Sequence, residues 1–295
     1  MGCFLPCGID SPAAFWDALL QGFDGICDVP ENRWRHSRFH DTNPEKRGCI
    51  RNAKGGFMDG VDLFDAEFFG YFPNEAQRMD PQQRLLLEVT HEALEDAGVP
   101  RDQVEGTRTS VFIGSFMYDY LHIQSASEQR DEINPYAAMG CALASLSNRI
   151  SYDFNLTGPS VTVDTACSGS LVALHLACRS LWGGEADLAI AGGVNVMLRP
   201  ETSIMLSKGG FLNPDQYCKA FDAAANEAYV ADGYANKRVA VLDAEETGRL
   251  ARGHLYQAFE GEAVPAHPFR VQVRQHQLHT RNAAVIGPDG AGRLL

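Results

Sequence analysis

The stretch "PSVTVDTACSGSLVALHLACRSLWGG", residues 159–184, decides the fold of this chain. Its first part, "PSVTVDTA" at 159–166, is rich in β-branched side chains and is typical of a strand. The part from Cys167 onward is largely apolar and predicts a helix that ends at Gly183 and Gly184. A strand that passes directly into a helix places Cys167 at the turn between them.

The same alternation of strands and helices extends along the chain. Short apolar runs predict further strands, and helical runs, two of which begin at Ser-Pro or Asp-Pro, predict helices. These are strands 109–115 and 186–198, and helices 11–22, 80–98 and about 134–150. Strands that are apolar on both faces and alternate with helices indicate a buried, mostly parallel sheet, so the fold class is α/β. Residues 28–60, rich in Arg, His, Asn and Gly, predict a long surface loop.

The composition excludes several classes of protein. The chain has 295 residues and a net charge of −13, with 38 acidic against 25 basic side chains. That balance argues against a nucleic-acid-binding protein, whose binding face would be basic, and leaves small molecules and proteins as partners. No apolar stretch is long enough to cross a bilayer, and the N-terminus lacks the features of a secretion signal. We therefore expect no membrane association and a cytoplasmic location.

The eight cysteines do not form a recognisable disulfide or metal framework. No C-x-x-C pair occurs, and the C-x-x-x-C formed by Cys3 and Cys7 has no second pair with ligand spacing. We expect no metal site. Reduced cysteines fit a cytosolic protein.

Cys167 is the candidate nucleophile. At a helix N-terminus the unpaired N–H groups favour an anion, which lowers the pKa of a thiol. The small neighbours Ser168, Gly169 and Ser170 would let a substrate approach, and backbone N–H groups there could stabilise an oxyanion. The competing interpretation is a buried cysteine that fills space, which we expect for Cys141 and Cys178. The hydrolase elbow G-x-[SC]-x-G matches only at Gly169.

The stretch "DTACSGSLVALH" resembles the active-site signature of β-ketoacyl synthases, the condensing domains of polyketide and fatty acid synthases. The resemblance extends over residues 2–234 through several longer stretches: "SPAAFWDALLQGFDGICDVPENRW", "FDAEFFGYFPNEAQRMDPQQRLLLEVTHEALEDAG", "NRISYDFNLTGPSVTVDTACSGS", "AIAGGVNVML" and "GFLNPDQYCKAFDAAAN". It identifies residues 1–234 as a β-ketoacyl synthase N-terminal domain. Residues 235–295 match the family poorly and are expected to be a divergent tail, with the C-terminal half of the family missing or scrambled.

The resemblance implies a fold and a reaction. The fold is thiolase-like, an αβαβα sandwich of two related halves, of which this chain would hold the N-terminal one. Cys167 would accept an acyl chain from the phosphopantetheine of an acyl carrier protein as a thioester, with its own backbone N–H as an oxyanion donor. A malonyl-type extender would then lose CO₂ and attack that thioester. The resemblance implies no bound cofactor or metal, and it implies a homodimer.

The histidines depart from the family pattern. The family uses two histidines, in H-G-T-G-T and N-x-G-H motifs, and neither motif occurs in this sequence. His175 and His91 lie in predicted helices and are expected to be structural. Four others have no matching context: His254, His267, His276 and His279. Two alternatives to a condensing enzyme therefore stay open: an incomplete ketosynthase that only dimerises or docks, and an enzyme that hydrolyses or transfers acyl groups at Cys167 without condensation.

Overall fold

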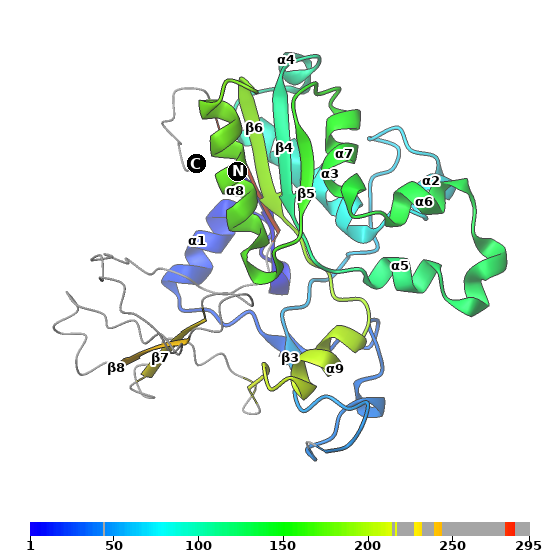
Figure 1. Ribbon diagram of the computed structural model, residues 1–295. Helices are drawn as coiled ribbons and strands as arrows, with labels where there is room; N and C mark the ends of the chain where they lie inside the picture. The colour runs from blue at the N-terminus through cyan, green and yellow to red at the C-terminus, as the bar shows by residue number, and fades with distance from the viewer. Residues whose placement is uncertain (44, 214–215, 217–226, 232–238, 244–280, 287–295) are drawn as a thin grey trace, which may run out of the picture.

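A five-stranded sheet in the order β1-β9-β6-β4-β5 forms the centre of the molecule (Figure 1). The computed structural model describes residues 1–43, 45–213, 216, 227–231, 239–243 and 281–286. The strands of the central sheet are β1 Gly2–Phe4, β4 Thr109–Gly114, β5 Ser160–Val163, β6 Leu188–Gly193 and β9 Arg281–Ile286. β4 pairs in parallel with β5 and β6, whereas β9 runs antiparallel to β1 and β6. The predicted α/β class is confirmed, whereas the sheet is mixed, because β9 runs antiparallel to both of its neighbours.

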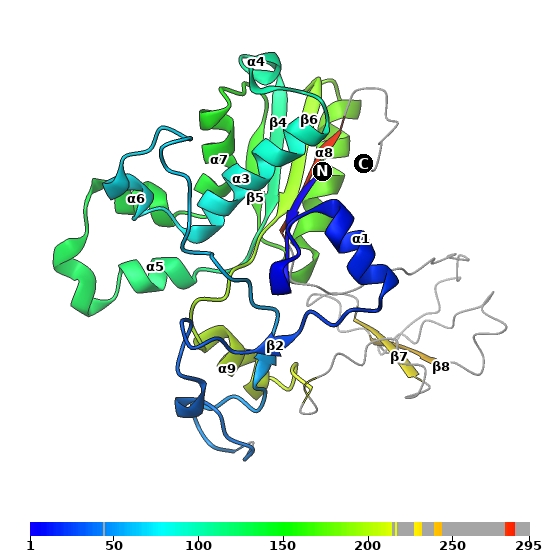
Figure 2. The same ribbon diagram turned by 180° about the vertical axis from the view of Figure 1, so that it is seen from behind.

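Helices cover both faces of this sheet and make three layers. α3 (Pro81–Asp96) and α7 (Ala144–Asp153) pack on one face, and α8 (Gly169–Trp182) packs on the other (Figures 1 and 2). α1 (Pro12–Leu20) packs beside β1, against Cys3, Leu5 and Ile9. In the described part of the chain, no helix combines the length and the apolar character that crossing a membrane would require.

Shorter elements complete the described chain. The remaining helices are α2 Pro73–Ala76, α4 Arg101–Val104, α5 Asp119–Gln124, α6 Pro135–Cys141 and α9 Glu201–Lys208. The 3₁₀ turns are η1 Pro6–Gly8, η2 His36–Arg38, η3 Ser127–Glu132 and η4 Ala166–Ser168. Two antiparallel pairs lie outside the central sheet: β2 Cys27–Asp28 with β3 Lys54–Gly55, and β7 Glu227–Ala231 with β8 Val239–Asp243.

The two faces of the sheet are packed with side chains of different size. The α3 and α7 side buries large residues, including Leu86, Ile113 and Phe154. The α8 side buries mainly alanines, among them Ala173 and Ala177 of the helix. Small side chains at an interface let a helix approach the sheet closely, and this brings the first turn of α8 against the strand ends.

Local rules explain where the main helices begin and end. The Ser11 Oγ accepts a hydrogen bond from the Ala14 N–H (3.3 Å), and Asp80 accepts one from the Gln82 N–H (2.8 Å). Proline occupies the first turn of both helices, where its missing N–H costs no hydrogen bond. Gly98, just beyond α3, has a left-handed backbone with φ of 68°. The predicted boundaries of α1 and α3 are confirmed to within two residues.

Two expectations from the sequence are wrong in part. Segment 28–60 is largely irregular, but it is not all surface, because it buries five apolar side chains: Trp34, Cys49, Ile50, Phe57 and Met58. The predicted helix over about 134–150 is two helices, α6 and α7. Ala142 between them is extended (φ −74°, ψ 130°), which ends α6.

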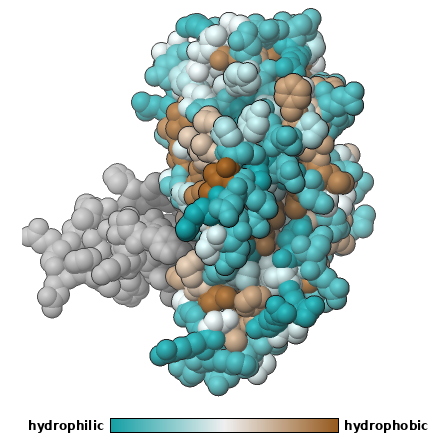
Figure 3. All heavy atoms as spheres, turned by 90° about the vertical axis from the view of Figure 1, so that its right-hand side faces the viewer, coloured by the Kyte–Doolittle hydropathy of each residue, from teal (hydrophilic) through white to brown (hydrophobic). Residues whose placement is uncertain are grey.

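Apolar residues gather in patches among hydrophilic ones on the side of the molecule where α5 and α6 lie (Figure 3).

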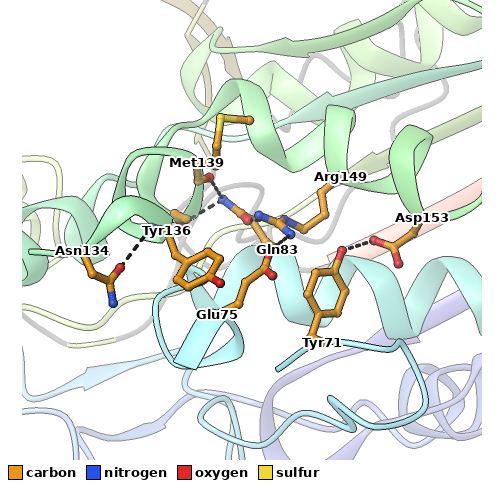
Figure 4. Close-up of polar contacts among 9 residues, drawn as sticks. Tyr71, Glu75, Gln83, Asn134, Tyr136, Met139, Arg149 and Asp153 are labelled. Carbon is orange, nitrogen blue, oxygen red and sulfur yellow. Dashed lines mark hydrogen bonds and ion pairs between the residues drawn. The ribbon is translucent and has the colours of Figure 1, made fainter. Parts of the chain in front are cut away.

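A network of polar side chains joins the segment before α3 to α6 and α7 (Figure 4). The Arg149 guanidinium donates to Gln83 (2.9 Å) and Glu75 (3.1 Å). The Gln83 amide nitrogen in turn donates to the backbone carbonyl of Met139 (3.0 Å). Tyr71 donates to Asp153 beside this group. Each buried charge and amide in the network has a partner, and these contacts offset the cost of removing the groups from water. The network therefore holds α6 and α7 against α3.

Asp80 gives the fold a pH dependence. Burial raises the pKa of this carboxyl from 3.8 to about 6, although hydrogen bonds from Gln82 oppose the shift. The folded chain therefore binds the proton more tightly than the unfolded chain. Its stabilising effect is fully present below about pH 4 and is lost as the pH rises to about 6.

We expect Asp80→Asn to flatten this part of the stability profile. The free energy of unfolding of the native chain, relative to that of the variant, should fall by on the order of 2 kcal/mol between pH 4 and pH 7. Urea titrations at several pH values measure it. Asp102→Asn, at an exposed position of α4, is the control and should leave the profile unchanged. If the unfolding free energies of Asp80→Asn and of the native chain changed equally with pH, Asp80 would not be the source of the pH dependence.

Candidate active site

Cys167 lies in the turn between β5 and α8, at the carboxyl end of the parallel strands. β5 ends at Val163, and its last carbonyl accepts a hydrogen bond from the Ser115 N–H just past β4 (3.1 Å). The chain then forms the 3₁₀ turn η4 before α8 begins at Gly169. Ligands of open α/β sheets bind at this edge, which supports Cys167 as the candidate nucleophile.

The predicted start of the helix at Cys167 is wrong by two residues. Ala166 has φ of 51°, in the left-handed region that a non-glycine residue rarely adopts, so a regular α-helix cannot run through it. The Asp164 carboxylate accepts the Ala166 N–H (3.0 Å), and the Ser168 hydroxyl donates to the Thr165 carbonyl (2.8 Å). These side chains hold the backbone in its strained form, and Cys167 is presented from the 3₁₀ turn.

A platform of glycines sets the position of this turn. Gly114 ends β4, Gly193 ends β6, and the two are register partners in the sheet. A Cβ added to Gly114 would lie 2.2 Å from the backbone carbon of Gly169, and one added to Gly193 would lie 2.7 Å from the Cβ of Ser170. The first turn of α8 therefore rests directly on the backbone of two strands. The sequence interpretation missed these two glycines; the signals were Gly114 near the end of the predicted strand 109–115 and the Gly-Gly pair within the predicted strand 186–198.

The surroundings of Cys167 suit a reaction with an external molecule. Among the cysteines in the described residues, only Cys7 and Cys167 are exposed. Within the same residues the backbone N–H of Cys167 has no hydrogen-bond partner, which leaves it free to face a developing oxyanion.

The other cysteines give a contrast to Cys167. Cys141 is buried as expected, and burial raises the pKa of its thiol to about 11. Cys178 is only half-buried, so the expectation of a space-filling core residue is wrong for it. Cys3 is buried beneath α1 whereas Cys7 is exposed, so the C-x-x-x-C sulfurs lie in different environments. No group of three or more metal-ligating side chains comes together in the described residues.

The two histidines that the sequence predicts to be structural, His91 and His175, lie away from Cys167. His175 is exposed on α8, eight positions beyond Cys167, which places it roughly 12 Å along the helix direction. His91 on α3 packs edge-on against Phe68, with ring centroids 4.9 Å apart, and pairs with Glu95 at 3.4 Å. Both positions fit the expected structural roles. The other histidines named from the sequence lie outside the described residues: His254, His267, His276 and His279.

A family model and curated relatives match this chain. The model described as "Beta-ketoacyl synthase, N-terminal domain" matches residues 1–241. One subunit of the phenolphthiocerol/phthiocerol polyketide synthase of Mycobacterium tuberculosis is 46% identical over 258 residues, which cover 86% of this chain and 17% of the relative. Another subunit of that synthase is 45% identical over 236 residues, which cover 79% of this chain and 10% of the relative. The chain thus spans only a small part of the length of these proteins.

Solved structures of ketosynthase domains also resemble this chain. The oxazolomycin ketosynthase domain KS7 of Streptomyces albus JA3453 superposes with a TM-score of 0.71 at 39% identity, covering 78% of this chain and 39% of that one. The ketosynthase from module 6 of the bacillaene synthase of Bacillus subtilis 168 superposes with a TM-score of 0.64 at 33% identity, covering 78% and 36%. The fold is that of the N-terminal half of a thiolase-like ketosynthase domain.

Proposed function

The chain belongs to the β-ketoacyl synthase family, and from that premise we propose that it serves the condensing step of polyketide or fatty acid assembly, with Cys167 as the acyl acceptor. The observation that carries the proposal is the exposed Cys167 on the 3₁₀ turn between β5 and α8. The turn lies at the strand edge where ligands bind, and its strained backbone presents the sulfur outward.

The geometry supports transfer of an acyl group to this sulfur. The Cys167 sulfur attacks the carbonyl carbon of an acyl thioester, and the free N–H of Cys167 donates to the oxygen as it becomes negative. The carbon–sulfur bond to the carrier then breaks, and the carrier thiol leaves with the proton from Cys167. The carrier chemistry is the phosphopantetheine arm of an acyl carrier protein, and the chain itself needs no bound cofactor for this step.

A short acyl thioester of N-acetylcysteamine tests the loading step, since it imitates the end of a phosphopantetheine arm. Mass spectrometry should find one acyl group on the chain, at Cys167. Trypsin leaves Cys167 and Cys178 on one peptide, residues 150–179, so fragment ions must separate them. Acyl groups spread over several cysteines would count against a specific acceptor.

The condensation itself needs groups that carry protons and stabilise the extender carbanion. In the described part of the chain no histidine makes a hydrogen bond with Cys167, and the two family histidine motifs are absent from the sequence. We expect the chain of 295 residues to take up an acyl group but to release no CO₂ from a malonyl thioester. Trapping of labelled CO₂ measures this, with a complete ketosynthase as the positive control. Release that depends on this chain would overturn the expectation.

We propose that residues 1–234 form the N-terminal domain and that a second half covers α8 in a complete ketosynthase. The inner face of α8 packs on the sheet through Ala173 and Ala177. Its outer face carries Leu171 and Trp182, which are 55% and 72% exposed. A helix that is apolar on both sides is normally buried on both sides. Residues 235–295, beyond this domain, stay a divergent tail in this proposal.

A homodimer and a cytoplasmic location complete the proposal. β5 is an edge strand, and within the described residues its outer side pairs with no other strand. Val161 on β5 is 41% exposed, and Tyr136 and Met139 of α6 are also exposed. An exposed edge strand with apolar residues beside it is a ready surface for a second copy.

A further inference from the structure

A buried glutamine joins the start of α3 to the chain just past β4. Gln82 is 2% exposed, and both ends of its side-chain amide make hydrogen bonds. The amide nitrogen donates to the Asp80 carboxylate (3.2 Å) and to the Met117 carbonyl (3.1 Å). The amide oxygen accepts the Ser115 hydroxyl (3.3 Å). Capping of α3 accounts for the contact with Asp80, but it does not account for the two contacts with segment 115–117.

Segment 115–117 in turn holds the strand that leads to Cys167. The Ser115 N–H donates to the carbonyl of Val163, the last residue of β5 (3.1 Å). Val163 is followed directly by Asp164, whose carboxylate braces the strained turn that carries the sulfur. A displacement of segment 115–117 therefore moves the end of the strand from which this turn begins.

Packing does not fix segment 115–117 on all sides. Phe116 lines a cavity of about 610 Å³ together with Tyr118 and Met205, so one side of the segment faces open space. The Phe116 N–H donates to the side-chain oxygen of Asn195, just past β6 (3.2 Å). Hydrogen bonds from α3, from β5 and from the chain after β6 therefore hold the segment in place, and Gln82 supplies two of them.

We propose that Gln82 is a positioning residue for acyl loading, a proposal that rests on the acceptor role proposed for Cys167. Gln82 holds segment 115–117, and through the backbone of this segment it sets the place of the turn that carries Cys167. Removal of its amide would leave the Met117 carbonyl and the Ser115 hydroxyl without these partners. Buried polar groups without partners are costly, so the segment should shift until they find new ones.

Gln83, the next residue of α3, offers a matched control. It is 1% exposed, but its amide nitrogen donates to the carbonyls of Met139 (3.0 Å) and Gly140 (2.9 Å) in α6. Its amide oxygen accepts a hydrogen bond from Arg149 of α7 (Figure 4). Replacing either glutamine with leucine keeps the size of the side chain and removes buried hydrogen bonds. The two variants therefore differ chiefly in which segment loses its partner.

Amide hydrogen exchange of the full chain, followed by mass spectrometry, tests the position of the turn without any reaction. In Gln82→Leu we expect faster exchange than in the native chain at segments 115–117 and 164–168, because the hydrogen bonds that protect them open more often. In Gln83→Leu we expect the faster exchange at α6 instead. Exchange at 164–168 that stays at the native rate in Gln82→Leu would overturn the proposal.

Acyl loading from the N-acetylcysteamine thioester measures the consequence for Cys167. Since a misplacement of about 1 Å can slow a reaction about 100-fold, we expect Gln82→Leu to lower the loading rate constant by about tenfold or more. Gln83→Leu should load at the native rate once each rate is divided by the folded fraction. Equal losses of rate in the two variants would show that both glutamines only stabilise the fold, and would refute the proposal.

Ser115→Ala decides the question if Gln82→Leu does not fold. It removes the hydroxyl that donates to Gln82 and leaves the backbone hydrogen bond to Val163 in place. Faster exchange at 164–168 together with slower loading would support the proposal, and native values of both would contradict it. A native chain that takes up no acyl group would instead refute the acceptor role of Cys167, whereas the exchange rates would still decide whether Gln82 positions the turn.

Discussion

Cys167→Ala is expected to remove the acyl group from the chain completely when the protein is incubated with an acyl thioester. Alanine has no sulfur, so no covalent thioester can form at the turn between β5 and α8. The loss should be total, and not partial, because the other cysteines of the described chain are buried or half-buried, except Cys7, which follows β1 at the opposite end of the sheet from β5. Intact mass spectrometry before and after incubation measures it.

The fold should survive this change. The Cys167 side chain is exposed, and the turn is held by Asp164, Thr165 and Ser168, none of which needs the sulfur. Circular dichroism and a urea titration should therefore match those of the native chain. Cys178→Ala, on α8, is the control and should load as the native chain does. An acyl group that remains on Cys167→Ala at the native level would refute the proposed nucleophile.

Gly114→Ala is expected to destabilise the fold and to displace the turn that carries Cys167. The added methyl would lie 2.2 Å from the Gly169 carbonyl carbon and 2.5 Å from the Ser170 nitrogen. Both are backbone atoms, which cannot rotate aside as a side chain can. Either α8 lifts from the sheet or β4 bends, and overpacking of this kind costs about 3 kcal/mol of unfolding free energy.

The opposite side of the same contact offers a matched control. A methyl on Gly169 would meet the Gly114 Cα at 3.2 Å, a tight but tolerable distance. Alanine is also preferred over glycine inside a helix by about 1 kcal/mol, which offsets the crowding. Gly169→Ala should therefore stay within about 1 kcal/mol of the native chain in a urea titration. Gly114→Ala should lose both stability and acyl loading. Equal effects of the two variants would contradict the claim that α8 rests on the backbone of Gly114.

Much of this fold follows from local sequence. The alternating apolar runs predicted the strands β4, β5 and β6, and the Ser-Pro and Asp-Pro pairs predicted the starts of α1 and α3. Capping and period depend on residues within a few positions of each other, so they can be read without the tertiary structure. The motifs around Cys167 likewise identify the family from the sequence alone.

The places where prediction failed have a common cause. The apolar residues of segment 28–60 carry no regular period, yet Trp34 and Ile50 are buried. The start of α8 was placed at Cys167 because apolar content gives no sign that Ala166 is left-handed. The strand β9, from the end of the chain, lies between β1 and β6, and its pairing spans most of the sequence. Contacts this distant leave no periodic trace along the chain.

The sequence by itself determined the α/β class, the family, and a cysteine held between a strand and a helix, because motifs and period are local. Only the tertiary structure decided how that cysteine is presented. α8 packs closely on Gly114 and Gly193, and Ala166 has a strained backbone. Both features require residues distant in the chain to meet within van der Waals distance.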